Sequence, residues 1–119
     1  MNEGMIVGQG IPRVDAPGKI TGCAEYTGDL AMANLLEADF LGSPYAYARI
    51  RSVDTSKAER LEGVVAVITG KDVEGLYGTT VLDRPILAQD VVRFVGEPVA
   101  AVAATSKEIA REAVKLIEV

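Results

Sequence analysis

The chain has 119 residues, of which 49% are hydrophobic and 24% are charged, and it carries a formal net charge of −5. This composition is typical of one globular domain, and the negative charge argues against nucleic acid as a partner, because phosphates attract basic surfaces. The sequence contains no histidine and one cysteine, Cys23, which excludes imidazole chemistry, an internal disulfide and a complete set of iron–sulfur ligands within this chain.

The sequence has no apolar run near the roughly 18 residues that a membrane-spanning helix requires, so we expect no membrane partner. Its N-terminus lacks the basic start and apolar stretch of a signal peptide. A single cysteine also fits a reducing compartment. Together these features predict a cytoplasmic protein.

Residues 1–28 are rich in glycine and include Pro12 and Pro17, a composition that predicts an extended, turn-rich arm with little helix. The run Gly8-Gln9-Gly10 resembles part of a phosphate-binding loop, but the third glycine of that pattern is missing and a proline follows. Turn glycines are therefore favoured over a nucleotide loop. For Cys23, the lack of any histidine base favours a packed or surface thiol over a nucleophile.

Residues 35–41 alternate between apolar and acidic side chains, which predicts a half-buried strand. The apolar face, which we expect to be buried, consists of Leu36, Ala38 and Phe40. The opposite face carries Glu37 and Asp39.

Gly42-Ser43-Pro44 then bends the chain, and residues 45–53 form a second predicted strand. Small and apolar side chains share one face of this strand: Ala46, Ala48 and Ile50. Tyr47, Arg49 and Arg51 share the other face. We interpret that second face as solvated or facing an interface, in preference to a substrate site.

Residues 54–61 predict a short helix, since Asp54 and Thr55 are favourable N-caps and Gly63 suits the position after its end. Residues 64–69 are apolar and predict a strand. Residues 73–85 are the least regular part of the sequence and predict a loop. Loops often carry specificity, which makes this segment a candidate for function without an assigned role.

Residues 91–104 form the longest stretch with little charge and are rich in valine and alanine. Their near-continuous apolar character predicts strands covered on both faces. Gly96 and Pro98 interrupt the run, so we expect two short strands joined at a bend, with Glu97 at that bend.

A C-terminal amphipathic helix follows, and Thr105 with Glu108 has the spacing of a capping box. Its apolar stripe consists of Ile109, Ala110, Ala113, Leu116 and Ile117, and packing in the core is favoured over a bound ligand on this stripe. Residues 117–119 predict the start of another strand. We therefore expect the chain to be a truncated fragment of a larger subunit.

Several ordered blocks resemble one family. They are Arg13-Val14-Asp15, residues 19–26 with Asp29, Gly42 to Ile50, Gly63 to Thr69 with Asp72, Asp83 to Ala88, Asp90, Val92 to Ala100, and Ala110, Ala113 and residues 117–119. In this order the blocks are similar to the start of the molybdenum-binding subunit of the xanthine dehydrogenase/aldehyde oxidase family. Two departures are Tyr47, where the family usually has histidine, and Met32-Ala33-Asn34, which replaces a common proline-glycine turn.

The resemblance implies one α/β-hammerhead domain over residues 1–119, of α+β class, with a mixed bent β-sheet, a short helix and a C-terminal amphipathic helix. It implies a scaffold domain in an oxidoreductase that hydroxylates purines, N-heterocycles or aldehydes with oxygen from water. The parent enzyme would use a molybdenum–pterin cofactor, with iron–sulfur clusters and FAD elsewhere in the complex. The expected partners are the remaining domains of the molybdenum subunit and the iron–sulfur and FAD subunits or domains.

The resemblance places the pterin contacts and the catalytic glutamate in other domains of the subunit, so no catalytic, cofactor-binding or metal residue is expected in this chain, Glu97 included. Ile86 and Leu87 are the candidates for lining the substrate funnel, and a place for both in the core is the competing interpretation. The alternative function is a free-standing hammerhead-fold binding or interaction module without catalysis. A small independent enzyme is disfavoured because a base, a nucleophile and a metal constellation are missing.

Overall fold

A computed structural model describes residues 8–119 of the chain. The chain divides into two units, Met1–Ala33 and Asn34–Val119. Asn34 has a φ of 61°, a left-handed conformation that asparagine tolerates better than most residues. Met32-Ala33-Asn34, where the sequence departs from the family's proline-glycine turn, coincides with the boundary between the units.

Within residues 8–33, the first unit holds two short helical segments, α1 (Ala16–Ile20) and the 3₁₀ helix η1 (Thr27–Asp29). The Asp15 carboxylate pairs with Lys19 Nζ at 2.7 Å and with Arg13 Nη2 at 2.9 Å. These two cations lower the pKa of Asp15. Neither helical segment contains a buried residue.

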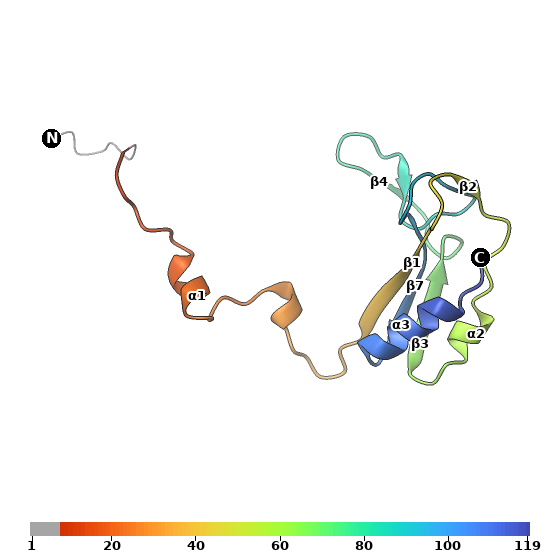
Figure 1. Ribbon diagram of the computed structural model, residues 1–119, viewed down its shortest axis with the longest axis horizontal. Helices are drawn as coiled ribbons and strands as arrows, with labels where there is room; N and C mark the ends of the chain where they lie inside the picture. The colour runs from red at the N-terminus through yellow and green to blue at the C-terminus, as the bar shows by residue number, and fades with distance from the viewer. Residues whose placement is uncertain (1–7) are drawn as a thin grey trace. The chain divides into compact units, whose positions relative to one another are not determined.

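The second unit is built on a three-stranded sheet in the order β1-β7-β3 (Figure 1). The strands are β1 (Glu37–Gly42), β3 (Val64–Thr69) and β7 (Pro98–Ala104). β2 (Ala48–Arg49) pairs with β6 (Val91–Val92), and β4 (Leu76–Tyr77) pairs with β5 (Arg84–Pro85). The α+β class is confirmed, while the described strand pairs are all antiparallel rather than mixed.

The apolar stretch of residues 91–104 forms two strands with a bend between them, as predicted. The bend includes Gly96 at a φ of 87°. β7 is the central strand of the sheet, but α3 covers only one of its faces, and Ala101 and Ala103 on the other face are half-buried, so the predicted cover on both faces is absent from this unit.

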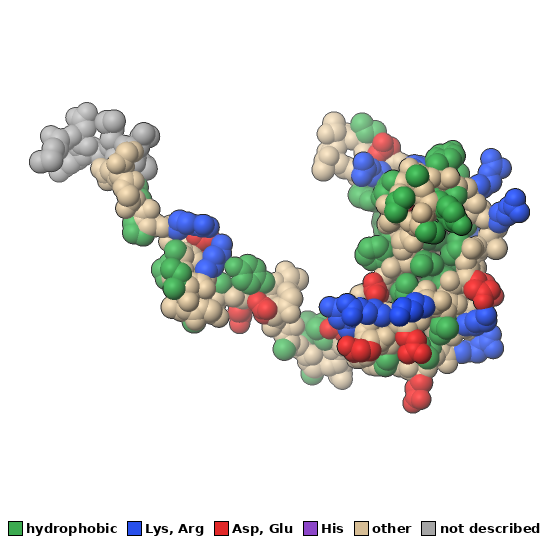
Figure 2. Space-filling model, viewed as in Figure 1, with side chains coloured by type: hydrophobic (Ala, Val, Ile, Leu, Met, Phe, Trp, Pro, Cys, Tyr) green, Lys and Arg blue, Asp and Glu red, His purple; other side chains and the backbone are tan. Residues whose placement is uncertain are grey.

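Helix α3 (Lys107–Leu116) packs on β7 and covers one face of the sheet, and α2 (Ser56–Glu59) packs beside it (Figure 1). The side chains that meet here are small and nearly inaccessible: Ala58, Ala100, Val102, Ala104, Ala110 and Ala113 are at most 1% exposed. The predicted apolar stripe of the helix is confirmed, since Ala110, Ala113 and Ile117 are buried and Ile109 and Leu116 are half-buried. Charged side chains lie along the outer side of α3 (Figure 2).

The start of α3 differs from the prediction by one residue. Ser106, not Thr105, is the N-cap, and its Oγ accepts a hydrogen bond from the Ile109 N–H at 3.3 Å. The Thr105 N–H instead donates to the Gly63 carbonyl at 2.9 Å. This bond to the residue before β3 holds Thr105 outside the helix.

Three other predicted elements differ in extent. The second strand, expected over residues 45–53, is limited to β2, because Ser43 and Tyr45 form a side-chain turn at its start. The short helix ends at Glu59 rather than Leu61. The predicted loop of residues 73–85 contains the paired strands β4 and β5.

The side chains of β1 alternate as predicted. The prediction of which face is covered was wrong, because the fold covers the acidic face and not the apolar one. The register places Asp39 opposite Val102 and Leu41 opposite Ala100, on the side that α3 covers. Phe40 faces the other way and is 57% exposed. Leu36, outside the strand, is 42% exposed. The sheet face opposite α3 is therefore open in this unit.

Within residues 8–119, no helix has both the length and the apolar character needed to cross a membrane.

We predict that Gly63→Ala destabilises the second unit. Gly63 has a φ of 91°, and an added Cβ would lie 2.6 Å from Ile109 Cδ1 and 2.9 Å from Thr105 Oγ1. The left-handed conformation alone costs a residue with a side chain about 1–3 kcal/mol. Urea unfolding measures the change, and Gly10→Ala is the control, because that glycine has open space around it. Equal stability of the two variants would contradict the prediction.

Candidate functional site

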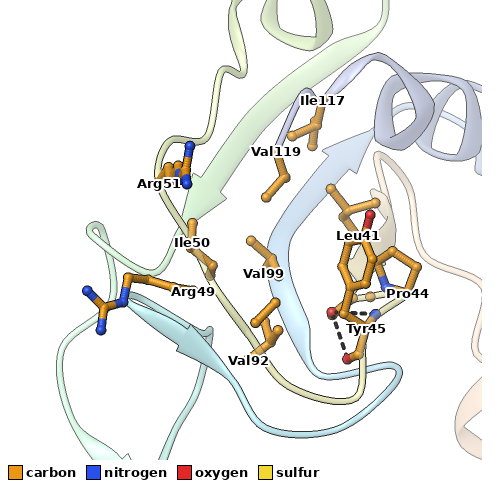
Figure 3. Close-up of a pocket in the computed structure, with 13 residues that line it drawn as sticks. Leu41, Pro44, Tyr45, Arg49, Ile50, Arg51, Val92, Val99, Ile117 and Val119 are labelled. Atoms are coloured by element: carbon orange, nitrogen blue, oxygen red, sulfur yellow. Dashed lines mark hydrogen bonds between the residues drawn. The ribbon is translucent and has the colours of Figure 1, made fainter.

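An apolar groove of about 420 Å³ lies between the Gly42–Arg51 segment, β6, the start of β7 and the C-terminus (Figure 3). Its size falls in the range of small-molecule pockets. The side chains that converge on it are aliphatic and come from segments far apart in the sequence: Leu41, Ile50, Val92, Val99, Ile117 and Val119.

A β-bulge on β7 brings Val99 into this groove. Leu41 pairs with Ala100 and Gly42 pairs with Pro98, so β7 has one extra residue at this point. A bulge of this kind interrupts the alternation of side chains along a strand. As a result, Val99 and Ala100 are both buried although they are neighbours on one strand.

The turn at one end of the groove is fastened to the β6–β7 bend by its backbone. The Ser43 N–H donates to the Glu97 carbonyl at 2.9 Å, and the Gly96 N–H donates to the Ser43 carbonyl at 2.7 Å. Ser43 Oγ also donates to the Tyr45 carbonyl and accepts from its N–H. A Cβ on Gly42 would lie 3.1 Å from Gly96 Cα, so the two segments approach closely here.

Glu97 is the one buried carboxylate of the described residues, with 4% of its surface exposed. One of its oxygens accepts the backbone N–H of Arg93, and the other pairs with Arg93 Nη1 at 2.9 Å. Both bonds join Glu97 to Arg93 within the connection between β6 and β7, and they stabilise its bent conformation. Glu97 therefore holds the connection between β6 and β7, the position predicted from the sequence, and is fully engaged there.

The polar residues around the groove do not converge on its centre. Arg49 and Arg51 extend away from the aliphatic side chains, and Tyr45 lies at the edge (Figure 3). Arg49, Arg51 and Tyr47 are exposed, as expected for that face of the predicted strand. Of the two hydroxyl residues in the lining, Ser43 is hydrogen-bonded through Oγ to the Tyr45 backbone and Tyr45 lies at the edge. No carboxylate or thiol side chain lines the groove, so it is suited to apolar packing.

Residues 8–119 contain no cluster of three or more His, Cys, Asp or Glu side chains arranged to hold a metal ion. Cys23 is exposed, which agrees with a surface thiol.

The two candidate funnel residues have different environments. Leu87 is 5% exposed and belongs to the core, whereas Ile86 is 47% exposed. Neither lines the apolar groove. The next residue, Ala88, donates its N–H to the Pro98 carbonyl at 2.8 Å, which fixes the segment beside the start of β7. A funnel role stays a prediction for both, and only Ile86 is accessible from outside this unit.

Sequence reasoning did not predict the groove. Its lining combines four separate segments, and the bulge that turns Val99 inward depends on pairing with β1. The one local signal was the Gly42-Ser43-Pro44 turn, which was predicted as a bend without its contact to Gly96.

Comparisons with known proteins assign this fold. The family described as "Aldehyde oxidase and xanthine dehydrogenase, a/b hammerhead domain" matches residues 21–119. A probable xanthine dehydrogenase subunit of Bacillus subtilis is 49% identical over 109 residues, which cover 90% of this chain and 15% of that protein.

Solved structures give the same result. The reconstituted CO dehydrogenase of Oligotropha carboxidovorans matches with a TM-score of 0.85 and 35% identity, over 93% of this chain and 14% of that one. Quinoline 2-oxidoreductase of Pseudomonas putida 86 matches with a TM-score of 0.80 and 37% identity, over 91% of this chain and 15% of that one.

The fold and the matched residues define an α/β-hammerhead domain. The chain belongs to the aldehyde oxidase and xanthine dehydrogenase family. It spans about one seventh of the length of these relatives, with 15% of the Bacillus protein and 14% and 15% of the solved chains.

We predict that Glu97→Ala destabilises the bend. The change removes the carboxylate that accepts the Arg93 N–H and pairs with the Arg93 guanidinium, and the loss of a hydrogen bond to a charged group costs about 1.5–3 kcal/mol. Chemical denaturation measures the loss. Glu62→Ala is the control, since Glu62 is exposed and a surface change of this kind stays within about 0.5 kcal/mol. Equal midpoints for the two variants would show that the Glu97 contacts contribute nothing.

Proposed function

We propose that this chain is the N-terminal scaffold domain of a molybdenum-cofactor-dependent hydroxylase or dehydrogenase of the xanthine dehydrogenase/aldehyde oxidase type. The substrates would be purines, N-heterocycles or aldehydes, with water as the source of oxygen. The enzyme would work in the cytoplasm. The single observation that carries this proposal is the match of residues 21–119 to the hammerhead-domain family. The relatives that contain this domain are about seven times longer than the chain.

The properties of the described residues support a scaffold role. They contain a packed core, a buried carboxylate used for a bend, and an aliphatic groove, but no grouping suited to bind a metal. In this proposal the molybdenum–pterin cofactor is bound by other domains of the subunit. Iron–sulfur clusters and FAD, in partner domains or subunits, would carry the electrons away.

Ile86 and Leu87 are the proposed contribution of this domain to the substrate funnel. Truncating buried Leu87 would remove core packing and cost about 2–5 kcal/mol, so its effect on catalysis could not be separated from its effect on folding. Ile86 is half exposed and gives the cleaner test.

We predict that Ile86→Ala in the full enzyme changes the substrate preference by several-fold. The preference is measured as kcat/KM for a large substrate divided by kcat/KM for a small one. An apolar contact of a few methylene groups discriminates by about 1–3 kcal/mol. Val14→Ala is the control, because Val14 is fully exposed on the arm. An unchanged ratio with unchanged stability would remove Ile86 from the funnel.

The mass and metal content of the natural protein test the proposed function. An antibody raised against this 119-residue sequence isolates the natural protein, and mass spectrometry with elemental analysis follows. We predict a species several times larger than 12.6 kDa that contains molybdenum. A molybdenum-free species near 12.6 kDa would contradict the assignment and favour the free-standing module.

A further inference from the structure

The sheet face opposite α3 consists of two cross-strand rows of apolar side chains. Phe40, Ala101 and Ile68 form one row, and Ala38, Ala103 and Ala66 form the other. Phe40 is 57% exposed and Ile68 is 40% exposed. The alanines of the edge strands are exposed and those of β7 are half-buried. We call these six residues the open face.

All six side chains of the open face are apolar. In an antiparallel sheet with one packed face, the other face is usually polar. Here the pattern is reversed on β1, where Glu37 and Asp39 lie on the side of α3 and Phe40 lies on the open side. Contiguous exposed apolar surface is a feature of interaction sites.

The shape of the open face follows from its composition. The two residues that β7 contributes, Ala101 and Ala103, are small, so the middle of the face is shallow. The larger Phe40 and Ile68 project from the edge strands on either side of β7. Small central residues allow a partner backbone to approach the sheet closely. The face carries no charge and no side-chain hydrogen-bonding group, so it fits a surface that is itself apolar and uncharged.

We propose that the open face is the docking surface for an apolar surface on another domain of the same large subunit. This inference rests on the proposed function. The length of the relatives favours that occupant. The segment that matches this chain makes up 14–15% of each relative or solved chain, so most of each of those chains lies outside the hammerhead domain.

Tethering also favours this occupant over a second copy of the chain. A stable interface between separate proteins buries about 1,200–2,000 Å², and six side chains of which four are alanine are too few to supply it alone. Domains joined in one chain dock through smaller surfaces, because the linkage keeps their effective concentration high.

The test compares Phe40→Glu in the natural large subunit and in the 119-residue chain. Because Phe40 lies on an edge strand and is exposed, we expect the thermal midpoint of the short chain to stay unchanged. In the large subunit the carboxylate would be buried without a partner, so we expect cleavage by a protease under native conditions to accelerate by about tenfold or more.

Two variants serve as controls in the same subunit. Phe40→Leu keeps the face apolar and should leave the cleavage rate near that of the unaltered protein. Glu112→Lys changes charge on an exposed position of α3 and should also have no effect.

Each other outcome overturns the proposal in a distinguishable way. A large subunit whose cleavage rate is unchanged by Phe40→Glu contradicts the docking face and leaves the proposed function intact. A 119-residue chain that dimerises in sedimentation, with Phe40→Glu dissociating it, assigns the face to a second copy. A natural protein that is short and free of molybdenum contradicts the proposed function first.

Discussion

The close contact between α3 and the central strand β7 is the interaction on which the second unit depends. Ala100, Val102 and Ala113 lie in one core cluster, and all three are at most 1% exposed. Side chains this small bring the helix close to the sheet, and larger ones at these positions would force strain into a packed interior. Because β7 pairs with both β1 and β3, its position sets the register of the whole sheet.

The same strand connects the core to the groove and to the open face. Its bulge between Pro98 and Ala100 turns Val99 into the apolar groove, while Ala101 and Ala103 point to the face opposite α3. One strand therefore presents three different surfaces within seven residues. A module of this kind suits a scaffold role, because its interaction surfaces are fixed by the rigid core rather than by loops.

Elements with strong local patterns were predictable from the sequence, and features that depend on distant partners were not. The strand of residues 64–69 and the stripe on α3 follow from their own periodicity. The alternation of β1 was also visible, but alternation does not reveal which face a helix will cover, and here it covers the acidic one. The N-cap of α3 was misassigned because the Gly63 carbonyl, far away in sequence, binds the Thr105 N–H. The groove is assembled from segments that the sequence could not bring together.

Because α3 covers the acidic side of β1, the fold presents an apolar sheet face, which we propose another domain covers. Hydroxyl-radical footprinting read by mass spectrometry measures this cover by comparing the oxidation of Phe40 in the natural protein and in the 119-residue chain. Phe40 is 57% exposed here, so it should be oxidised readily in the short chain and strongly protected in the natural protein. Tyr47, at 77% exposed, is the internal reference outside the open face. Equal oxidation of Phe40 in the two proteins would show that no other domain covers the open face.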